Sequence, residues 1–313
     1  MKKMRIALIL LALASVWACA ASSDSPMSAS SAISATEGDQ ELKRGVYWYQ
    51  KGCMPKAMTH FQAAHEHYSL GDRRIGIARS LNSMANVHRQ QGRRANALIF
   101  YNAAVKAARG GGDRRVLAQV LANKAAVLID ENDLAGAEDL LDEAERLAGE
   151  RGAVPALVLN YRAMVMIKAK REDRAAALLD RAAAVDFGND PTIRATLRFS
   201  HGRLMMHAGQ YPQAENLFTQ ALELDRQTEC ARCIAEDLAA LADVHERRGE
   251  DEAALDCLER SLKIYALLEN RTKVDEYLGR LERLAGKTGD DPRVTVYFIK
   301  QWLAGEAVDA VCR

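Results

Sequence analysis

One alanine recurs along this chain about every 40 residues, and this interval restricts the fold more than any other feature. Twelve residues before each recurrence stands a second small residue. The recurring alanines are Ala57, Ala97, Ala137, Ala175, Ala214 and Ala254, spaced 40, 40, 38, 39 and 40 residues apart. The preceding small residues are Gly45, Ala85, Ala125, Ala163, Gly202 and Ala242. A period of this length indicates a stack of helical hairpins.

Each recurring alanine is followed, four and seven residues later, by a large apolar residue and another small residue. The large residues are Phe61, Tyr101, Leu141, Leu179, Phe218 and Leu258. The small ones are Ala64, Ala104, Ala144, Ala182 and Ala221, with Ser261 as the exception. Spacings of four and seven share one helix face. We therefore expect antiparallel helices that approach closely at the small side chains, beside the large one.

The turn within each unit is also recognisable. It contains Gly52, Gly92, Asn132, Lys170, Gly209 or Gly249, mostly residue types that accept the left-handed conformation at a helix end. Lys170 departs from this pattern. Between units, Asp113 follows three glycines, and Asp190 precedes Pro191, which predicts a cap residue followed by proline at the first helical position.

The succession of small, small, aromatic and small residues at Gly202, Ala214, Phe218 and Ala221 resembles the signature of the tetratricopeptide repeat (TPR) family. This resemblance implies an all-α fold, a right-handed α-α superhelix (solenoid) of about six TPR-like hairpins. The expected repeats are 41–72, 73–111, 112–151, 152–189, 190–227 and 228–270, followed by C-terminal capping helices over 271–313. The period exceeds the usual 34 residues of the family, so its curvature does not follow from the resemblance.

Composition and motifs exclude several classes of function. A formal charge of +1 gives no general attraction to nucleic acid. The sequence contains no nucleophile elbow, phosphate-binding glycine loop or zinc-protease motif, so no enzymatic activity and no cofactor are predicted. His60 and His65 are five residues apart, which points them to different helix faces, and no metal site is expected there.

The first residues have a different character. Lys2, Lys3 and Arg5 precede an uncharged apolar stretch, which predicts a signal peptide over 1–18. Val16, Ala18 and Cys19 resemble a bacterial lipobox, although Trp17 departs from it. The expected product is a bacterial TPR lipoprotein with lipidated Cys19 and a Ser/Ala-rich flexible linker over 19–40.

Ala20 follows this cysteine, where an aspartate would signal retention in the inner membrane. The resemblance therefore favours a lipid-anchored protein of the outer membrane that faces the periplasm. Two alternatives remain. Cleavage before Ala21 would release an unanchored periplasmic or secreted binding module, and an uncleaved segment would act as the anchor.

The family resemblance places ligand-binding residues on the first helix of each hairpin, in a concave groove. Carried over by repeat position, the candidates are Arg79, Asn82, Asn86, Arg89, Gln90, Asn123, Asp130, Asn160, Tyr161, Met164, Lys168, Phe199, Arg203, Met206 and His207, with Asp243, Glu246 and Arg247 further along. The implied partner is a protein or peptide, and the implied function is a non-enzymatic interaction scaffold that assembles or positions an envelope complex. The alternative interpretation is that the longer helices turn some of these residues into the interfaces between repeats.

Charge is segregated along the repeats. Residues 73–115 carry ten basic side chains and one acidic one, whereas residues 130–150 carry nine acidic and one basic. This pattern is typical either of a docking surface for an acidic partner or anionic headgroups, or of neighbouring repeats that pair their solvated faces.

The cysteines leave two interpretations open. Without Cys19, five remain, so at least one is unpaired in an oxidising compartment. Cys230 and Cys233 form the only Cys-x-x-Cys motif, which predicts either a local disulfide at a helix start or a ligand- or redox-sensing receptor.

Overall fold

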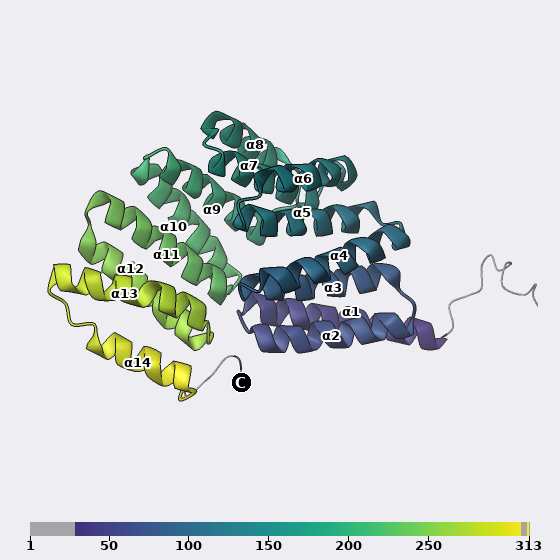
Figure 1. Cartoon of the computed structure of the whole chain (residues 1–313), viewed down its shortest axis with the longest axis horizontal. Coiled ribbons are helices and arrows are strands. Elements are labelled where there is room, and N and C mark those ends of the chain that lie inside the picture. Colours follow the sequence, from purple (N-terminus) through teal and green to yellow (C-terminus); the bar gives the residue numbers. More distant parts are fainter. Residues whose placement is uncertain (1–28, 308–311, 313) are drawn as a thin grey trace, which may run out of the picture.

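The computed structural model describes residues 29–307 and Cys312, and this part of the chain consists of fourteen α-helices without a β-strand (Figure 1). In chain order they are α1 (Ala29–Gln50), α2 (Met54–Leu70), α3 (Arg74–Gln90), α4 (Arg94–Gly111), α5 (Arg114–Asp130), α6 (Leu134–Ala148), α7 (Ala153–Lys168), α8 (Glu172–Ala184), α9 (Pro191–His207), α10 (Tyr211–Gln227), α11 (Ala231–Arg248), α12 (Asp251–Leu267), α13 (Arg271–Thr288) and α14 (Arg293–Ala304). No helix within this described part is both long and apolar enough to cross a membrane.

The first twelve helices form six antiparallel hairpins, from α1 and α2 to α11 and α12, and each hairpin packs on the next. The first helices α1, α3, α5, α7 and α9 also contact one another in succession and form an inner layer. The prediction of an α-α superhelix built from six hairpins with a helical cap is therefore confirmed.

The recurring small residues form the seam within each hairpin. All six alanines from Ala57 to Ala254 are fully buried, and the large residues four positions later are at most 2% exposed. A Cβ atom on Gly45 would lie 2.4 Å from the Phe61 ring, and one on Gly202 would lie 2.6 Å from the Phe218 ring. The small residue of the first helix thus provides the space that the large residue of the second helix fills.

Ser261 is the one residue that breaks the alanine pattern, and the structure explains it. Its side chain is fully buried, and its Oγ donates a hydrogen bond to the backbone carbonyl of Ala235 at 2.8 Å. The hydroxyl is therefore satisfied within a seam that otherwise accepts only apolar atoms.

The turns behave as their residue types predict. All six turn residues have positive φ, between 56° and 82°, and this includes Lys170 at 56°. Lys170 shows that the repeat geometry imposes the left-handed conformation even on a residue that carries a Cβ atom, at a cost of about 1–2 kcal/mol. The capping predictions also hold, because the Asp113 and Asp190 carboxylates accept backbone N–H bonds at the starts of α5 and α9.

The flexible linker expected over 19–40 is wrong from Ala29 onward, where α1 begins. The physical reason lies in contacts with α2. Tyr68 donates its hydroxyl to Asp39 Oδ1 at 2.5 Å, and its ring packs on Gly38, while His60 pairs with Glu41 at 2.6 Å. The predicted signal peptide and Cys19 lie outside the described residues.

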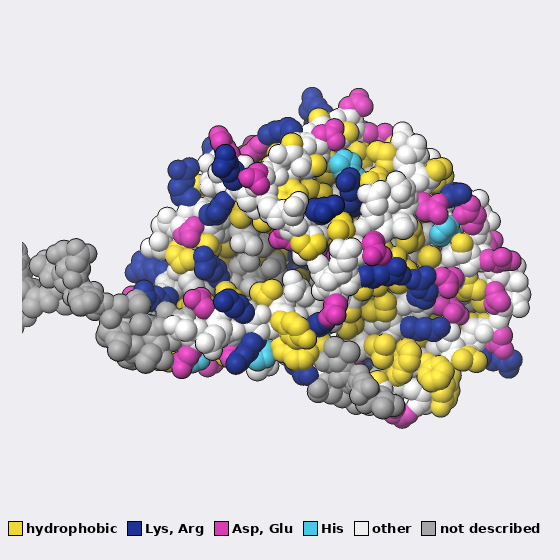
Figure 2. Space-filling model, turned by 180° about the vertical axis from the view of Figure 1, so that it is seen from behind, with side chains coloured by type: hydrophobic (Ala, Val, Ile, Leu, Met, Phe, Trp, Pro, Cys, Tyr) yellow, Lys and Arg dark blue, Asp and Glu magenta, His cyan; other side chains and the backbone are white. Residues whose placement is uncertain are grey.

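The cap covers the last repeat with buried Val274 and Leu281 of α13 and Ile299 of α14. Its outer face is only partly polar. Val294, Tyr297 and Phe298 are exposed, and apolar side chains gather over α14 at the lower right of Figure 2. The exposed Phe298 ring lies against that of Trp302, with ring centres 5.6 Å apart.

The array curves until its first hairpin meets its sixth. Lys51, in the turn after α1, pairs with Glu229, which precedes α11. The Arg232 guanidinium lies 5.7 Å from the centre of the Tyr49 ring, and a disulfide joins Cys53 to Cys312. These contacts connect segments far apart in the chain, and the disulfide places Cys312 at the turn of the first hairpin.

The packing of the seam predicts a large effect of Phe218→Ala. Because Phe218 is 1% exposed, the cavity and the lost apolar burial should lower the free energy of unfolding by about 3–5 kcal/mol. Urea unfolding followed by circular dichroism measures this. Ile99→Ala, at a side chain that is 65% exposed, is the control and should change stability by less than about 0.5 kcal/mol. Equal effects of the two substitutions would contradict the proposed seam.

The end-to-end disulfide predicts a stability difference that depends on redox conditions. The double variant Cys53→Ser/Cys312→Ser should be less stable than the unmodified chain by about 2–4 kcal/mol without reductant, since the crosslink restricts the unfolded chain. Thermal unfolding with and without a reductant checks this. The difference should largely disappear under reducing conditions, and its persistence there would show that the disulfide is not its cause.

Candidate functional site

The inner layer contains a pocket between α3, α5, α7 and α9, with one residue from α4. Its volume is about 210 Å³. The lining residues are Arg89, Arg94, Ala126, Ile129, Asp130, Tyr161, Met164, Lys168 and Arg203, which we call the inner basic pocket. Four of these side chains are cationic and one is anionic, while the remainder supply apolar and aromatic surface.

The charges of this pocket are only partly compensated. Arg89 Nε donates to Asp130 Oδ2 at 2.8 Å. Within the described part of the chain, Arg94, Lys168 and Arg203 form no ion pair with any carboxylate. Burial lowers the pKa of Arg203, and Asp130 is the one acidic group that counteracts it. The pocket therefore has an excess of positive charge in a partly desolvated position, which favours an anionic group.

The structure brings together six of the residues that the sequence placed in the groove. Arg89, Asp130, Tyr161, Met164, Lys168 and Arg203 all line the inner basic pocket. Arg94 was not a candidate, because the family resemblance points to first helices only, whereas Arg94 begins the second helix α4. The three-residue turn between α3 and α4 carries it back to the inner surface.

Three candidate asparagines are buried, whereas the sequence placed them on the groove surface. Asn82 and Asn123 are each 7% exposed and hydrogen-bond to one another at 3.0 Å between α3 and α5. Asn160 is 3% exposed within α7. The alternative interpretation holds for Asn82 and Asn123, which bond to one another between first helices, whereas the buried Asn160 Oδ1 has no hydrogen-bond partner among the described residues.

The remaining candidates are dispersed. Asn86 accepts a hydrogen bond from the Tyr101 hydroxyl at 2.5 Å. Phe199 packs on Phe218 with ring centres 5.3 Å apart, and Met206 packs on the hydrophobic core of the C-terminal helices.

Arg79 and His207 are exposed and Gln90 is partly buried, but none of them lines the inner basic pocket. Asp243 and Glu246 both pair with Arg280 of the cap, and Arg247 lies outside the pocket.

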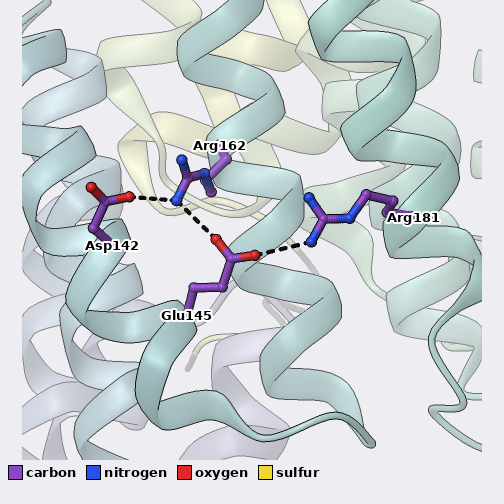
Figure 3. Close-up of polar contacts among 4 residues, drawn as sticks. All are labelled: Asp142, Glu145, Arg162 and Arg181. Carbon is purple, nitrogen blue, oxygen red and sulfur yellow. Dashed lines mark hydrogen bonds and ion pairs between the residues drawn. The ribbon is translucent and has the colours of Figure 1, made fainter.

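The segregated charges meet across repeats. Arg109 of the basic segment pairs with Glu143 of the acidic segment at 2.9 Å, as Arg89 does with Asp130. Further along, Glu145 binds both Arg162 at 2.8 Å and Arg181 at 3.0 Å, and Arg162 also binds Asp142 at 2.5 Å (Figure 3). Part of the charge pattern therefore serves contacts between α6, α7 and α8, each worth about 1 kcal/mol or less at such exposure.

Cys230 and Cys233 are joined by a disulfide at the start of α11. Beside them lie two buried aspartates, Asp225 of α10 and Asp237 of α11, whose carboxyl groups interact directly. Burial raises the pKa of Asp225, and burial together with the neighbouring Asp225 raises the pKa of Asp237.

Comparison with known proteins gives a consistent result. The tetratricopeptide repeat family model matches residues 45–110 and 192–267, which correspond to the first two and last two hairpins. Comparison with curated protein sequences gives no match.

Many solved structures are similar to the chain, among them the following three. The Rap protein complexed with competence and sporulation factor has 18% identity and a TM-score of 0.54, over 80% of this chain and 75% of that one. BtubC from P. vanneervenii has 16% identity and a TM-score of 0.46, over 70% and 91%.

A thermophilic TPR protein of Thermus thermophilus has 21% identity and a TM-score of 0.46, over 63% of this chain and 98% of that one. The similarity to the Rap protein establishes a shared fold. The chain therefore contains tetratricopeptide repeats over residues 45–110 and 192–267, within a stack of six helical hairpins.

Proposed function

We propose that this protein is a non-enzymatic scaffold that binds a partner protein through an acidic segment of that partner, received in the inner basic pocket. The observation that carries this proposal is the set of three cations, Arg94, Lys168 and Arg203, that have no ion-pair partner among the described residues. A carboxylate entering the pocket would accept charge-assisted hydrogen bonds from them.

The shape and composition of the pocket suit part of a peptide. A volume of about 210 Å³ accommodates one or two side chains, not a folded domain. Tyr161, Met164 and Ile129 offer apolar surface beside the cations, so an acidic residue next to an apolar one would contact both. The Rap protein, which shares the fold, is complexed with competence and sporulation factor, so this architecture is compatible with holding a partner.

Selection of peptides tests the chemistry of the partner. A displayed library of random peptides is panned on the purified chain, and the selected sequences are expected to be enriched in Asp and Glu. Lys168→Glu/Arg203→Glu should weaken binding of a selected peptide at least about tenfold, because attraction becomes repulsion, and higher salt should weaken it for the unmodified chain. Isothermal titration calorimetry measures both effects.

The matched control is Arg174→Glu, which reverses an exposed charge on α8 outside the pocket. It should leave peptide affinity unchanged, and circular dichroism should show that all variants remain helical. Peptides without acidic enrichment, or equal affinity of the pocket variant and the unmodified chain, would contradict the proposed recognition.

We further propose that the scaffold is lipid-anchored through Cys19 in the outer membrane and assembles or positions an envelope complex. The support is the lipobox-like stretch ending at Cys19 and the apolar segment before it. The alternative is an unanchored periplasmic or secreted binding module. Crosslinking in intact cells followed by mass spectrometry identifies the partner, and a set of partners without envelope proteins would refute the proposed role.

Labelling of cells with radioactive palmitate tests the anchor. The unmodified chain should incorporate label and fractionate with membranes, whereas Cys19→Ser should do neither. Cys257→Ser is a suitable control, since Cys257 is a buried free thiol in α12. Absence of label in the unmodified chain would favour the unanchored form.

A further inference from the structure

The disulfide at the start of α11 belongs to a cluster of four side chains with metal-binding atoms. Cys230 is the N-cap of α11, and Cys233 and Asp237 follow three and seven residues later, so all three share one helix face. Asp225 reaches the same place from α10. The ligand atoms of Asp225, Cys230 and Cys233 all lie within 4.8 Å of one another.

The disulfide-bonded state leaves part of this cluster unsatisfied. Asp237 is 1% exposed, and its Oδ2 atom is buried without a hydrogen-bond partner. Its carboxyl group lies against that of Asp225, which is 6% exposed. Two carboxyl groups buried in contact are costly, and an orphaned carboxylate oxygen adds to the cost. A cation bound between the two carboxyl groups would reduce their repulsion and would give the unpaired oxygen a partner.

We propose that the reduced form of Cys230 and Cys233, together with Asp225 and Asp237, binds one zinc ion. The two sulfur atoms select a borderline-soft cation such as Zn²⁺ over Mg²⁺ or Ca²⁺, which prefer oxygen ligands. Four ligands match the tetrahedral geometry of closed zinc sites. Zinc–sulfur bonds of about 2.3 Å place tetrahedral ligand atoms about 3.5–4 Å apart, so the atoms of Asp225, Cys230 and Cys233, now within 4.8 Å of one another, and that of Asp237 would have to move together when the metal binds.

The disulfide and the zinc ion are alternative states of the cluster. A dithiol reductant transfers two electrons and two protons to the disulfide; its own thiols become a disulfide, the S–S bond breaks, and two cysteine thiols form. Zinc binding then releases the two thiol protons to water, because the metal is bound by thiolates, and the carboxyl groups that coordinate it do so as carboxylates. The thiolates are favoured by the N-terminus of α11 and by Arg232, whose Nη2 donates to Cys233 Sγ at 3.3 Å.

The test uses the full chain, purified under reducing and non-oxidising conditions, with Zn²⁺ or Co²⁺ as the only added metal. Atomic emission after dialysis should find one zinc per reduced chain and none per oxidised chain. Cobalt should give a thiolate-to-metal charge-transfer absorption that Cys233→Ser weakens or removes. Asp225→Asn should reduce zinc affinity by about tenfold or more.

Two controls separate this cluster from the other cysteines. Cys53→Ser/Cys312→Ser removes the second disulfide, and Cys257→Ser removes the free thiol; both variants should bind zinc as the unmodified chain does. Zinc should also protect Cys230 and Cys233, but not Cys53 and Cys312, from alkylation by iodoacetamide, which locates the metal without relying on the stability of any variant.

The proposal is overturned if the reduced chain, with its disulfides shown by mass to be open, retains no zinc. It is equally overturned if Cys233→Ser keeps the cobalt charge-transfer absorption at full strength, or if zinc protects none of the cysteines from alkylation. Unchanged zinc affinity in Asp225→Asn would refute the participation of the carboxylates and hence the four-residue site.

Discussion

The close approach of two helices at a small residue, with a large residue beside it, is the interaction on which the rest of this structure depends. It recurs in all six hairpins, and in the hairpins of Phe61 and Phe218 the opposing residue has to be glycine. Because each hairpin repeats the same seam, each packs on the next in nearly the same way, and small rotations accumulate along the array. The curvature that results brings the first hairpin to the sixth and turns the first helices inward.

Most of the fold could be predicted from the sequence because this seam is a local, periodic pattern. The buried alanines, the positive φ of the turns and the caps at Asp113 and Asp190 all follow from residue type and spacing. The start of α1 could not be predicted, since residues 29–40 have the composition of a linker, and it is the contacts of Asp39 and Glu41 with α2 that hold this segment as helix.

The candidate site was predictable in part. Tyr161, Lys168 and Arg203 lie where the family resemblance placed them. Asn82 and Asn123 instead lie between α3 and α5. A small rotation of a longer helix about its axis moves a side chain from the groove to the interface with the next helix. Residue spacing alone does not distinguish these two positions. The position of Arg94 in the pocket could not be predicted, because it depends on the path of the turn between α3 and α4. The contact of Asp225 with Asp237 could not be predicted either, because it depends on how α10 packs against α11.

Contacts of the first hairpin with the sixth and with Cys312 close the array end to end, and the inner basic pocket lies on its inner layer. Peptide mapping without reduction tests this closure most directly, since only a closed array places Cys53 beside Cys312 across 259 residues. If the array is closed, one proteolytic fragment with Cys53 and another with Cys312 should be recovered as a disulfide-linked pair, and reduction should separate the two fragments. Recovery of Cys53 and Cys312 as free thiols from oxidised protein, or of either joined to Cys257, would contradict it.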